Sequence, residues 1–208
     1  MDDKETGRVE AFSDGVFAVA ITLLVLNIHG LDNPLSHPAD SDLATILLKQ
    51  WPTYLAFATS FATIGVMWIN HHRLFTHIKR VDTNLLALNL LLLFVIVFIP
   101  FPTALLTSYI THPENHIAAV LYSATCILLA ISFNVLWRYA SHKNRLLDKD
   151  ADREAVQAIT NQYRFGPLFY VISLILAFIY VPASVVLNLL LALFFALPGR
   201  HARSAPED

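Results

Sequence analysis

Residues 15–31 read GVFAVAITLLVLNIHGL and contain no Asp, Glu, Lys or Arg. An α-helix crosses a membrane with about 20 mainly apolar residues, within a range of about 17–25. The whole chain has the same character, because 56% of its 208 residues are hydrophobic and only 14% are charged. In a typical soluble domain, roughly 45–50% of the residues are hydrophobic and about 25% are charged. We therefore expect an all-α, polytopic membrane protein.

Four further stretches lack charged residues, at 50–72, 84–113, 115–137 and 165–199. The stretch that begins at residue 84 is almost purely aliphatic and aromatic, and we expect it to be a peripheral helix that faces lipid. The last stretch would be about 50 Å long as one straight helix, whereas the hydrocarbon core is about 30 Å thick. Pro182 lies at its middle, and proline removes a backbone donor and clashes with the preceding turn. We expect two short spans there, with one kinked helix as the alternative.

The predicted architecture is one transmembrane domain of six helices over residues 1–200, followed by a short cytoplasmic tail at 201–208. Its spans are expected at about 9–29, 46–72, 82–108, 116–138, 162–181 and 183–198. This arrangement places 13 of the 14 Lys and Arg residues on one side of the membrane and only Lys49 on the other. Because cytoplasmic loops are rich in Lys and Arg, both termini are predicted to be cytoplasmic, in a multi-pass protein of the plasma membrane. The segment 141–162 is expected to be a solvated connector, with a regulatory role as the alternative.

Charge and motif content exclude several classes of function. A formal net charge of −2 argues against a nucleic-acid binder. The single cysteine, Cys126, excludes an intrachain disulfide. Adjacent His71 and His72 would point about 100° apart on a helix, so they cannot easily share one metal ion. The sequence also lacks the nucleophile-elbow and zincin motifs, and we expect no enzyme, no metal and no cofactor.

Asp14 is the polar residue of the first span that most needs an explanation, because a carboxylate is costly inside a membrane. We expect it about one to two turns into the cytoplasmic half. The end of the second span supplies possible donors at a matching depth: Trp68, Asn70, His71 and His72. A polar network between the two helices is one interpretation. The other is an Asp at the membrane interface that water and lipid headgroups solvate.

A second feature of the first span is a stripe of residues at three- and four-residue spacing, which places them on one helix face. The stripe consists of Phe12, Gly15, Val19, Thr22, Leu23 and Leu26. Small residues such as Gly15 allow close helix packing, so the stripe is typical of a packing face. It is also compatible with a pore lining, in which aliphatic rings gate the path and threonine oxygens touch the ion.

Two segments resemble a known family. Arg8 followed by Phe12-Ser13-Asp14, and then by the run AITLLVL at 20–26, resembles the RxxxFSD signature of the TMEM175 family of potassium channels. Residues 65–75, GVMWINHHRLF, are similar to the matching segment of its second helix. The resemblance implies a homotetramer embedded in membrane lipids, with helix 1 of each subunit lining a central path for K⁺ as the permeant ion.

The resemblance also implies roles for individual residues. Val19, Leu23 and Leu26 match the hydrophobic pore constriction, although isoleucine is more usual than valine at the first position, and Thr22 matches a threonine layer that bears on selectivity. A structural motif network is implied for Arg8, Phe12, Ser13, Asp14, Trp68, Asn70 and His71. Without a carbonyl filter, passive flux with modest K⁺ over Na⁺ selectivity is expected. The alternative is a proton-permeable pathway or an ion-coupled secondary transporter.

Overall fold

The computed structural model describes residues 3–28, 42–110, 112–148 and 151–197, and its regular elements there are helices and one isolated bridge between Ile78 and Leu147. The first elements are α1 (Asp3–Leu23), a 3₁₀ turn η1 (Leu24–Asn27), α2 (Leu43–Lys49) and α3 (Trp51–His77). They are followed by α4 (Thr83–Phe98), α5 (Pro100–Tyr109), α6 (Asn115–Ser141) and the 3₁₀ turn η3 (His142–Asn144). The last are α7 (Arg153–Arg164), α8 (Gly166–Ile179) and α9 (Val181–Ala196).

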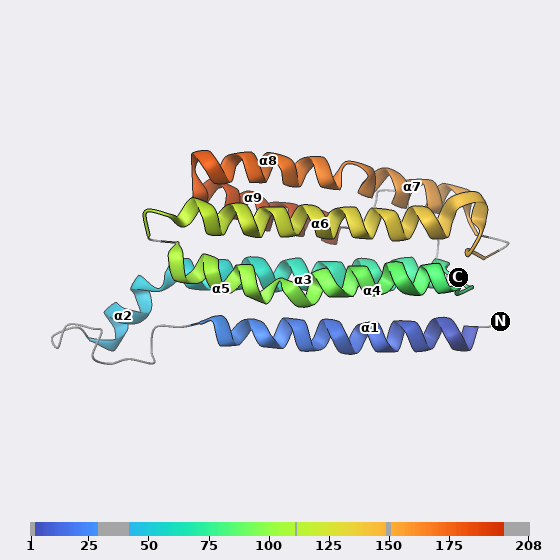
Figure 1. Cartoon of the computed structure of the whole chain (residues 1–208), viewed down its shortest axis with the longest axis horizontal. Helices are drawn as coiled ribbons and strands as arrows, with labels where there is room; N and C mark the ends of the chain where they lie inside the picture. Colours follow the sequence, from blue (N-terminus) through green and yellow to red (C-terminus); the bar gives the residue numbers. More distant parts are fainter. Residues whose placement is uncertain (1–2, 29–41, 111, 149–150, 198–208) are drawn as a thin grey trace, which may run out of the picture.

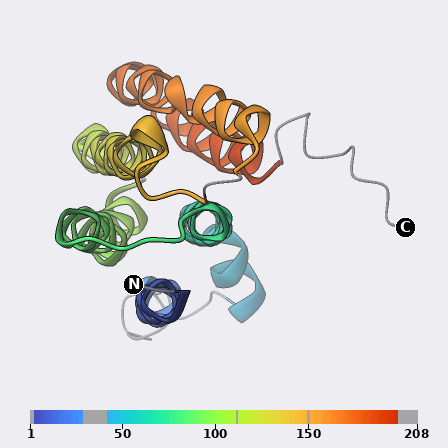
Figure 2. The same cartoon turned by 90° about the vertical axis from the view of Figure 1, so that its right-hand side faces the viewer.

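The long helices lie side by side in one bundle (Figure 1). α3 and the α4–α5 pair occupy the middle, and α6, α8 and α9 form the layer farthest from α1. α1 lies at the edge of the bundle, where it packs against α3, α4 and α5, while its opposite side is uncovered (Figure 2). The first helix therefore has one buried face and one free face.

Five helical segments of the described chain are long and apolar enough to cross a membrane. They run over Glu5–Asn27, Trp51–His77, Thr83–Tyr109, Asn115–Asn144 and Arg153–Ile179. A sixth apolar helix, Val181–Ala196, has 16 residues, so it is about 24 Å long. The expectation of an all-helical chain rich in apolar helices is confirmed, and the sixth helix is shorter than a full span.

The stretch 165–199 is divided at Tyr180, which adopts an extended conformation with φ −156° and ψ 97° between α8 and α9. The two helices fold back on each other (Figure 1). Pro182 lies in the first turn of α9, where its missing N–H would have no intrahelical partner in any case. The division therefore precedes Pro182 by two residues. Buried Ser184 and Ser173 join the helices, since the Ser184 hydroxyl donates to the Ser173 carbonyl at 2.8 Å.

The third span differs from the expected peripheral helix. α4 packs against both α1 and α6, and one of its faces is buried through Leu85, Asn89, Leu92 and Ile96. Aliphatic side chains suit contact with lipid as well as contact with other helices, because lipid tails are as apolar as leucine. The burial of α4 could therefore not be inferred from its residue types.

The segment between α3 and α4 is hydrogen-bonded to the segment that follows η3, at the end of the bundle where the N-terminus lies (Figure 1). The backbone N–H groups of Lys79 and Arg80 both donate to the Leu146 carbonyl, at 2.9 and 3.2 Å. Asp82 caps α4 through Oδ1, and its Oδ2 accepts a hydrogen bond from Tyr139 Oη at 2.7 Å and lies 3.3 Å from the Arg145 guanidinium. Within the expected connector 141–162, Leu146 and Leu147 are buried against the bundle, whereas residues 142–145 are exposed. The later part of the connector forms helix α7.

Candidate functional site

The predicted stripe lies on the free face of α1. All six of its members are exposed within the single chain: Phe12, Gly15, Val19, Thr22, Leu23 and Leu26. The exposed fractions are 57% for Val19, 39% for Leu23 and 64% for Leu26, whereas Phe17, Ala20 and Leu24 on the opposite face are at most 2% exposed. The stripe is therefore not a packing face inside the subunit.

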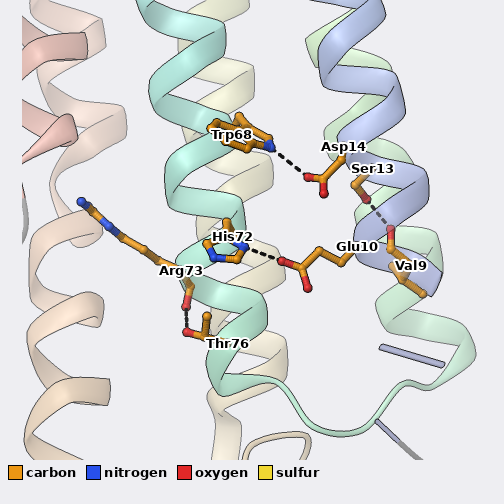
Figure 3. Close-up of polar contacts among 8 residues, drawn as sticks. All are labelled: Val9, Glu10, Ser13, Asp14, Trp68, His72, Arg73 and Thr76. Atoms are coloured by element: carbon orange, nitrogen blue, oxygen red, sulfur yellow. Dashed lines mark hydrogen bonds and ion pairs between the residues drawn. The ribbon is translucent and has the colours of Figure 1, made fainter. Parts of the chain in front are cut away.

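Two polar bridges join α1 to α3, one helical turn apart (Figure 3). Trp68 Nε1 donates to Asp14 Oδ1 at 2.8 Å, and His72 Nδ1 lies 2.6 Å from Glu10 Oε1. The spacing of four residues on each helix places both bridges on matching faces. The Asp14 carboxylate thus has a donor from the protein. Glu10 was not predicted as a site residue, although its place one turn before Asp14 is visible in the sequence.

A third link runs from α1 through α4 to α3. Asn89 Nδ2 donates to Ser13 Oγ at 2.9 Å, and His71 Nε2 donates to Asn89 Oδ1 at 2.9 Å. The Ser13 hydroxyl donates in turn to the Val9 carbonyl at 2.8 Å (Figure 3). Ser13, His71 and Asn89 are all buried, and the His71 ring stacks on Phe75 with its centroid at 4.4 Å. Ser13 and His71 are therefore joined through a residue of the third span.

Asn70 belongs to a different contact from the one expected. Its Nδ2 donates to the Phe195 carbonyl at 3.1 Å, and Arg73 donates to the Ala196 carbonyl at 3.1 Å and to Asn70 Oδ1 at 3.2 Å. Adjacent helix positions point about 100° apart, so Asn70 faces α9 when His71 faces α4. Asn70 and Arg73 thereby supply donors to carbonyls at the end of α9, which have no partners within their own helix.

Comparison with known proteins shows a common architecture. A potassium channel of Chamaesiphon minutus is 50% identical over 94% of this chain and 96% of its own. A crystal structure of a lysosomal potassium-selective channel TMEM175 homolog from Chamaesiphon minutus matches with a TM-score of 0.85 and 47% identity, over 95% of this chain and 99% of that one. The family model described as endosomal/lysosomal potassium channel TMEM175 matches residues 8–100.

The chain belongs to the TMEM175 family. A human relative described as the endosomal/lysosomal proton channel TMEM175 is 34% identical over 64% of this chain and 27% of its own. These relatives are described as channels and not as enzymes.

Two residues of the family signature lie outside the hydrogen-bonded network. Within the described ranges, no hydrogen bond or ion pair joins Arg8 to α3, and Phe12 is 58% exposed. Both line a surface groove of about 480 Å³ between α1 and α4, together with Leu86, Asn89 and Leu90. The four-residue spacing of the signature thus places Arg8 and Phe12 beside the network rather than in it.

The histidines of this TMEM175 chain point to different neighbours. His71 faces Asn89 of α4, and His72 faces Glu10 of α1. Among the described residues, no group of three or more His, Cys, Asp or Glu side chains is placed to hold a metal ion.

Proposed function

We propose that the chain is a potassium channel, in which four copies surround a central path lined by α1. The observation that carries this proposal is the free face of α1, which is uncovered although the opposite face is anchored by three polar links. The similarity over nearly the full length to a structure described as a potassium-selective channel homolog supports it. A second copy of the chain that covered this face would also bury Val19, Leu23 and Leu26.

The proposed path has two chemical elements. Val19, Leu23 and Leu26 form successive aliphatic rings that constrict it and hinder the passage of fully hydrated ions. Thr22 forms the selectivity layer. Its hydroxyl donates to the Val19 carbonyl at 2.9 Å, so lone pairs of its oxygen stay free to contact a partly dehydrated cation. Flux is passive, and discrimination between K⁺ and Na⁺ is modest.

The membrane topology that we propose has six crossings, with α9 as the sixth, in the plasma membrane and with both termini in the cytoplasm. The excess of Lys and Arg on one side supports this orientation. α9 is short, and its last carbonyls receive donors from Asn70 and Arg73. This contact allows α9 to end within the protein, because carbonyls in hydrocarbon need internal donors.

The test is purification of the full chain, a mass measurement of the assembly, and K⁺ flux in liposomes. We expect a protein mass of four times 23.3 kDa and a K⁺ flux that follows the gradient. Leu23→Ala is expected to raise the leak or loosen selectivity, whereas Leu128→Ala on the exposed face of α6 serves as the matched control. A monomeric protein, or flux that is identical for Leu23→Ala and the unchanged chain, contradicts the proposal.

Proton permeation is a second candidate, because the human relative is described as a proton channel. Glu10, Asp14 and His72 supply titratable groups beside α1. Currents that reverse at the proton equilibrium potential, and that stay unchanged when K⁺ is replaced, would support it. Saturating uptake coupled to a second gradient would instead indicate an ion-coupled secondary transporter.

A further inference from the structure

The end of α1 opposite to its signature is held by one buried side chain. Asn27 is only 8% exposed, and its Nδ2 donates to the Pro100 carbonyl at 2.8 Å. The backbone carbonyl of the same residue lies 3.2 Å from Thr107 Oγ1, which also donates to the Ala104 carbonyl at 2.9 Å. An amide buried without a partner is costly, so these contacts tie Asn27 to α5.

The part of α5 that contacts Asn27 is linked to neighbouring helices by hydrogen bonds between hydroxyl groups. Thr103 Oγ1 donates to the Ile99 carbonyl at 2.8 Å and lies 2.8 Å from Ser60 Oγ of α3. Ser60 Oγ is also 3.1 Å from Tyr122 Oη of α6. All three of these side chains are buried. The segment that holds Asn27 is therefore linked to two other helices of the bundle.

The same residue closes the 3₁₀ turn η1. Leu23 has φ −64° and ψ −21°, values typical of a 3₁₀ helix, and side chains three residues apart are eclipsed in this geometry. Leu24 and Asn27 accordingly share the buried face, and Leu23 and Leu26 share the exposed one. A continued α-helix would rotate Leu26 by about 60° from Leu23.

We propose that Asn27 is a positioning residue for the outer part of the pore: its bond to the Pro100 carbonyl holds η1 in the 3₁₀ form and keeps Leu23 and Leu26 stacked toward the central path. This inference rests on the proposed function, because it assumes that these two leucines line the path. The inner part of α1 is held by the bridges to α3 and α4, and the outer part is held by Asn27.

The experiment measures the K⁺/Na⁺ permeability ratio and the leak of the full chain in liposomes. Asn27→Leu removes both the donor and the polarity, and we expect at least a threefold change in the ratio or the leak with an unchanged mass of the assembly. Thr107→Val removes only the hydroxyl and is expected to shift the same quantity in the same direction by less. Thr107→Ser keeps the hydroxyl and is expected to behave as the unchanged chain.

The matched control is Asn134→Leu. Asn134 Nδ2 donates to the Tyr163 carbonyl at 3.0 Å, a bond of the same kind that involves neither α1 nor α5. We expect its permeability ratio to equal that of the unchanged chain. An equal shift in Asn134→Leu would show a general loss of packing and would overturn the inference.

Three outcomes distinguish a failure of this inference from a failure of the function on which it rests. If Leu23→Ala changes the ratio but Asn27→Leu and Thr107→Val do not, the positioning role of Asn27 is wrong and the pore stands. If Asn27→Leu does not assemble, the comparison of Thr107→Val with Thr107→Ser decides. Equal K⁺/Na⁺ permeability ratios for these two variants would overturn the positioning role of Asn27. If Leu23→Ala has no effect either, the pore assignment fails with it.

Discussion

Asn89 is the residue that ties the first three spans together. Its amide donates to Ser13 of α1 and accepts from His71 of α3, and all three side chains are buried. The second ring nitrogen of His71, Nδ1, has no hydrogen-bond partner among the described residues. The bond to Asn89 is therefore the hydrogen bond that satisfies the buried His71 ring among the described residues.

Asn89→Leu is expected to destabilise the folded chain by about 2–3 kcal/mol, because a buried polar group that loses its partner bears its full desolvation cost. The measurement is the thermal unfolding midpoint in detergent. Asn84→Leu on the same helix is the control, since the Asn84 side chain is exposed and its amide makes an exposed bond of 3.2 Å to Tyr139 Oη. Equal midpoints for the two variants would contradict a structural role for the Ser13–Asn89–His71 link.

At the scale of the elements, α3 supplies hydrogen-bond donors to the C-terminal end of α9. Arg73 and Asn70 donate to two of its last carbonyls, and a cation near a helix C-terminus also interacts favourably with the helix dipole. α9 has only 16 residues, so its last turn lies next to the side of α3. Its final carbonyls therefore need donors from α3.

Arg73→Met is expected to loosen the last turns of α9 and to lower the stability of the chain by about 1–2 kcal/mol. Hydrogen exchange of the α9 amides checks this, with faster exchange expected in the segment 190–196. Arg153→Met, which changes an exposed residue of α7, is the control. Unchanged exchange in α9 would show that the Arg73 contact does not hold its end.

The contact between Asp82 at the start of α4 and Tyr139 of α6 is expected to weaken in acid. Burial by itself would raise the pKa of Asp82, but hydrogen bonds from Tyr139 and the Leu85 N–H, together with the Arg145 guanidinium, hold the pKa below its usual range. A carboxyl whose pKa is lowered by folding stabilises the folded state above its unfolded pKa, about 3.9, and loses that effect as the pH falls through the folded pKa.

Asp82→Asn is therefore expected to reduce stability at pH 7 by about 1 kcal/mol or less, since the group is partly exposed. Asparagine can keep the helix cap through its Oδ1, and its NH₂ group takes the place of the Oδ2 that accepts from Tyr139, so the variant removes the charge and this acceptor together. The difference in unfolding midpoint between variant and unchanged chain is expected to shrink as the pH falls from about 5 through the folded pKa of Asp82, which lies below the unfolded value of about 3.9. A difference that is constant over this range would show that the carboxylate charge contributes nothing.

At the scale of the whole molecule, the free face of α1 has its proposed role only when several copies assemble. Within one chain Thr22 is exposed, and its hydroxyl is the polar group that the stripe presents among aliphatic side chains. In the proposed tetramer four such hydroxyls surround the path, and a cation that sheds part of its water gains their oxygens as partners.

Thr22→Ala is expected to lower the K⁺ preference over Na⁺ severalfold while flux continues, because the ring of oxygens is lost but the path is not closed. The measurement is the reversal potential under K⁺/Na⁺ exchange. Thr22→Ser keeps the hydroxyl and is expected to retain the preference. A K⁺ preference that is the same in Thr22→Ala and Thr22→Ser would remove Thr22 from the selectivity layer.

Composition and periodicity alone determined that this chain is all-helical and apolar, because so few charged residues cannot cover a soluble exterior. Two short motifs were enough to predict the family, which the similarity to its members confirms. The stripe on α1 was also predictable, since residues at three- and four-residue spacing share a face whatever lies against it.

Only the tertiary structure decided which partner each polar side chain meets. Asn70 and His71 are adjacent in sequence, yet one bonds α9 and the other α4, because a rotation of about 100° separates them. Asn89 and Asn27 are single amides in apolar runs, and each finds its partner on a helix far away in sequence. Helix rotation and crossing are set by the packing of many side chains together, and a pattern along one chain does not contain that information.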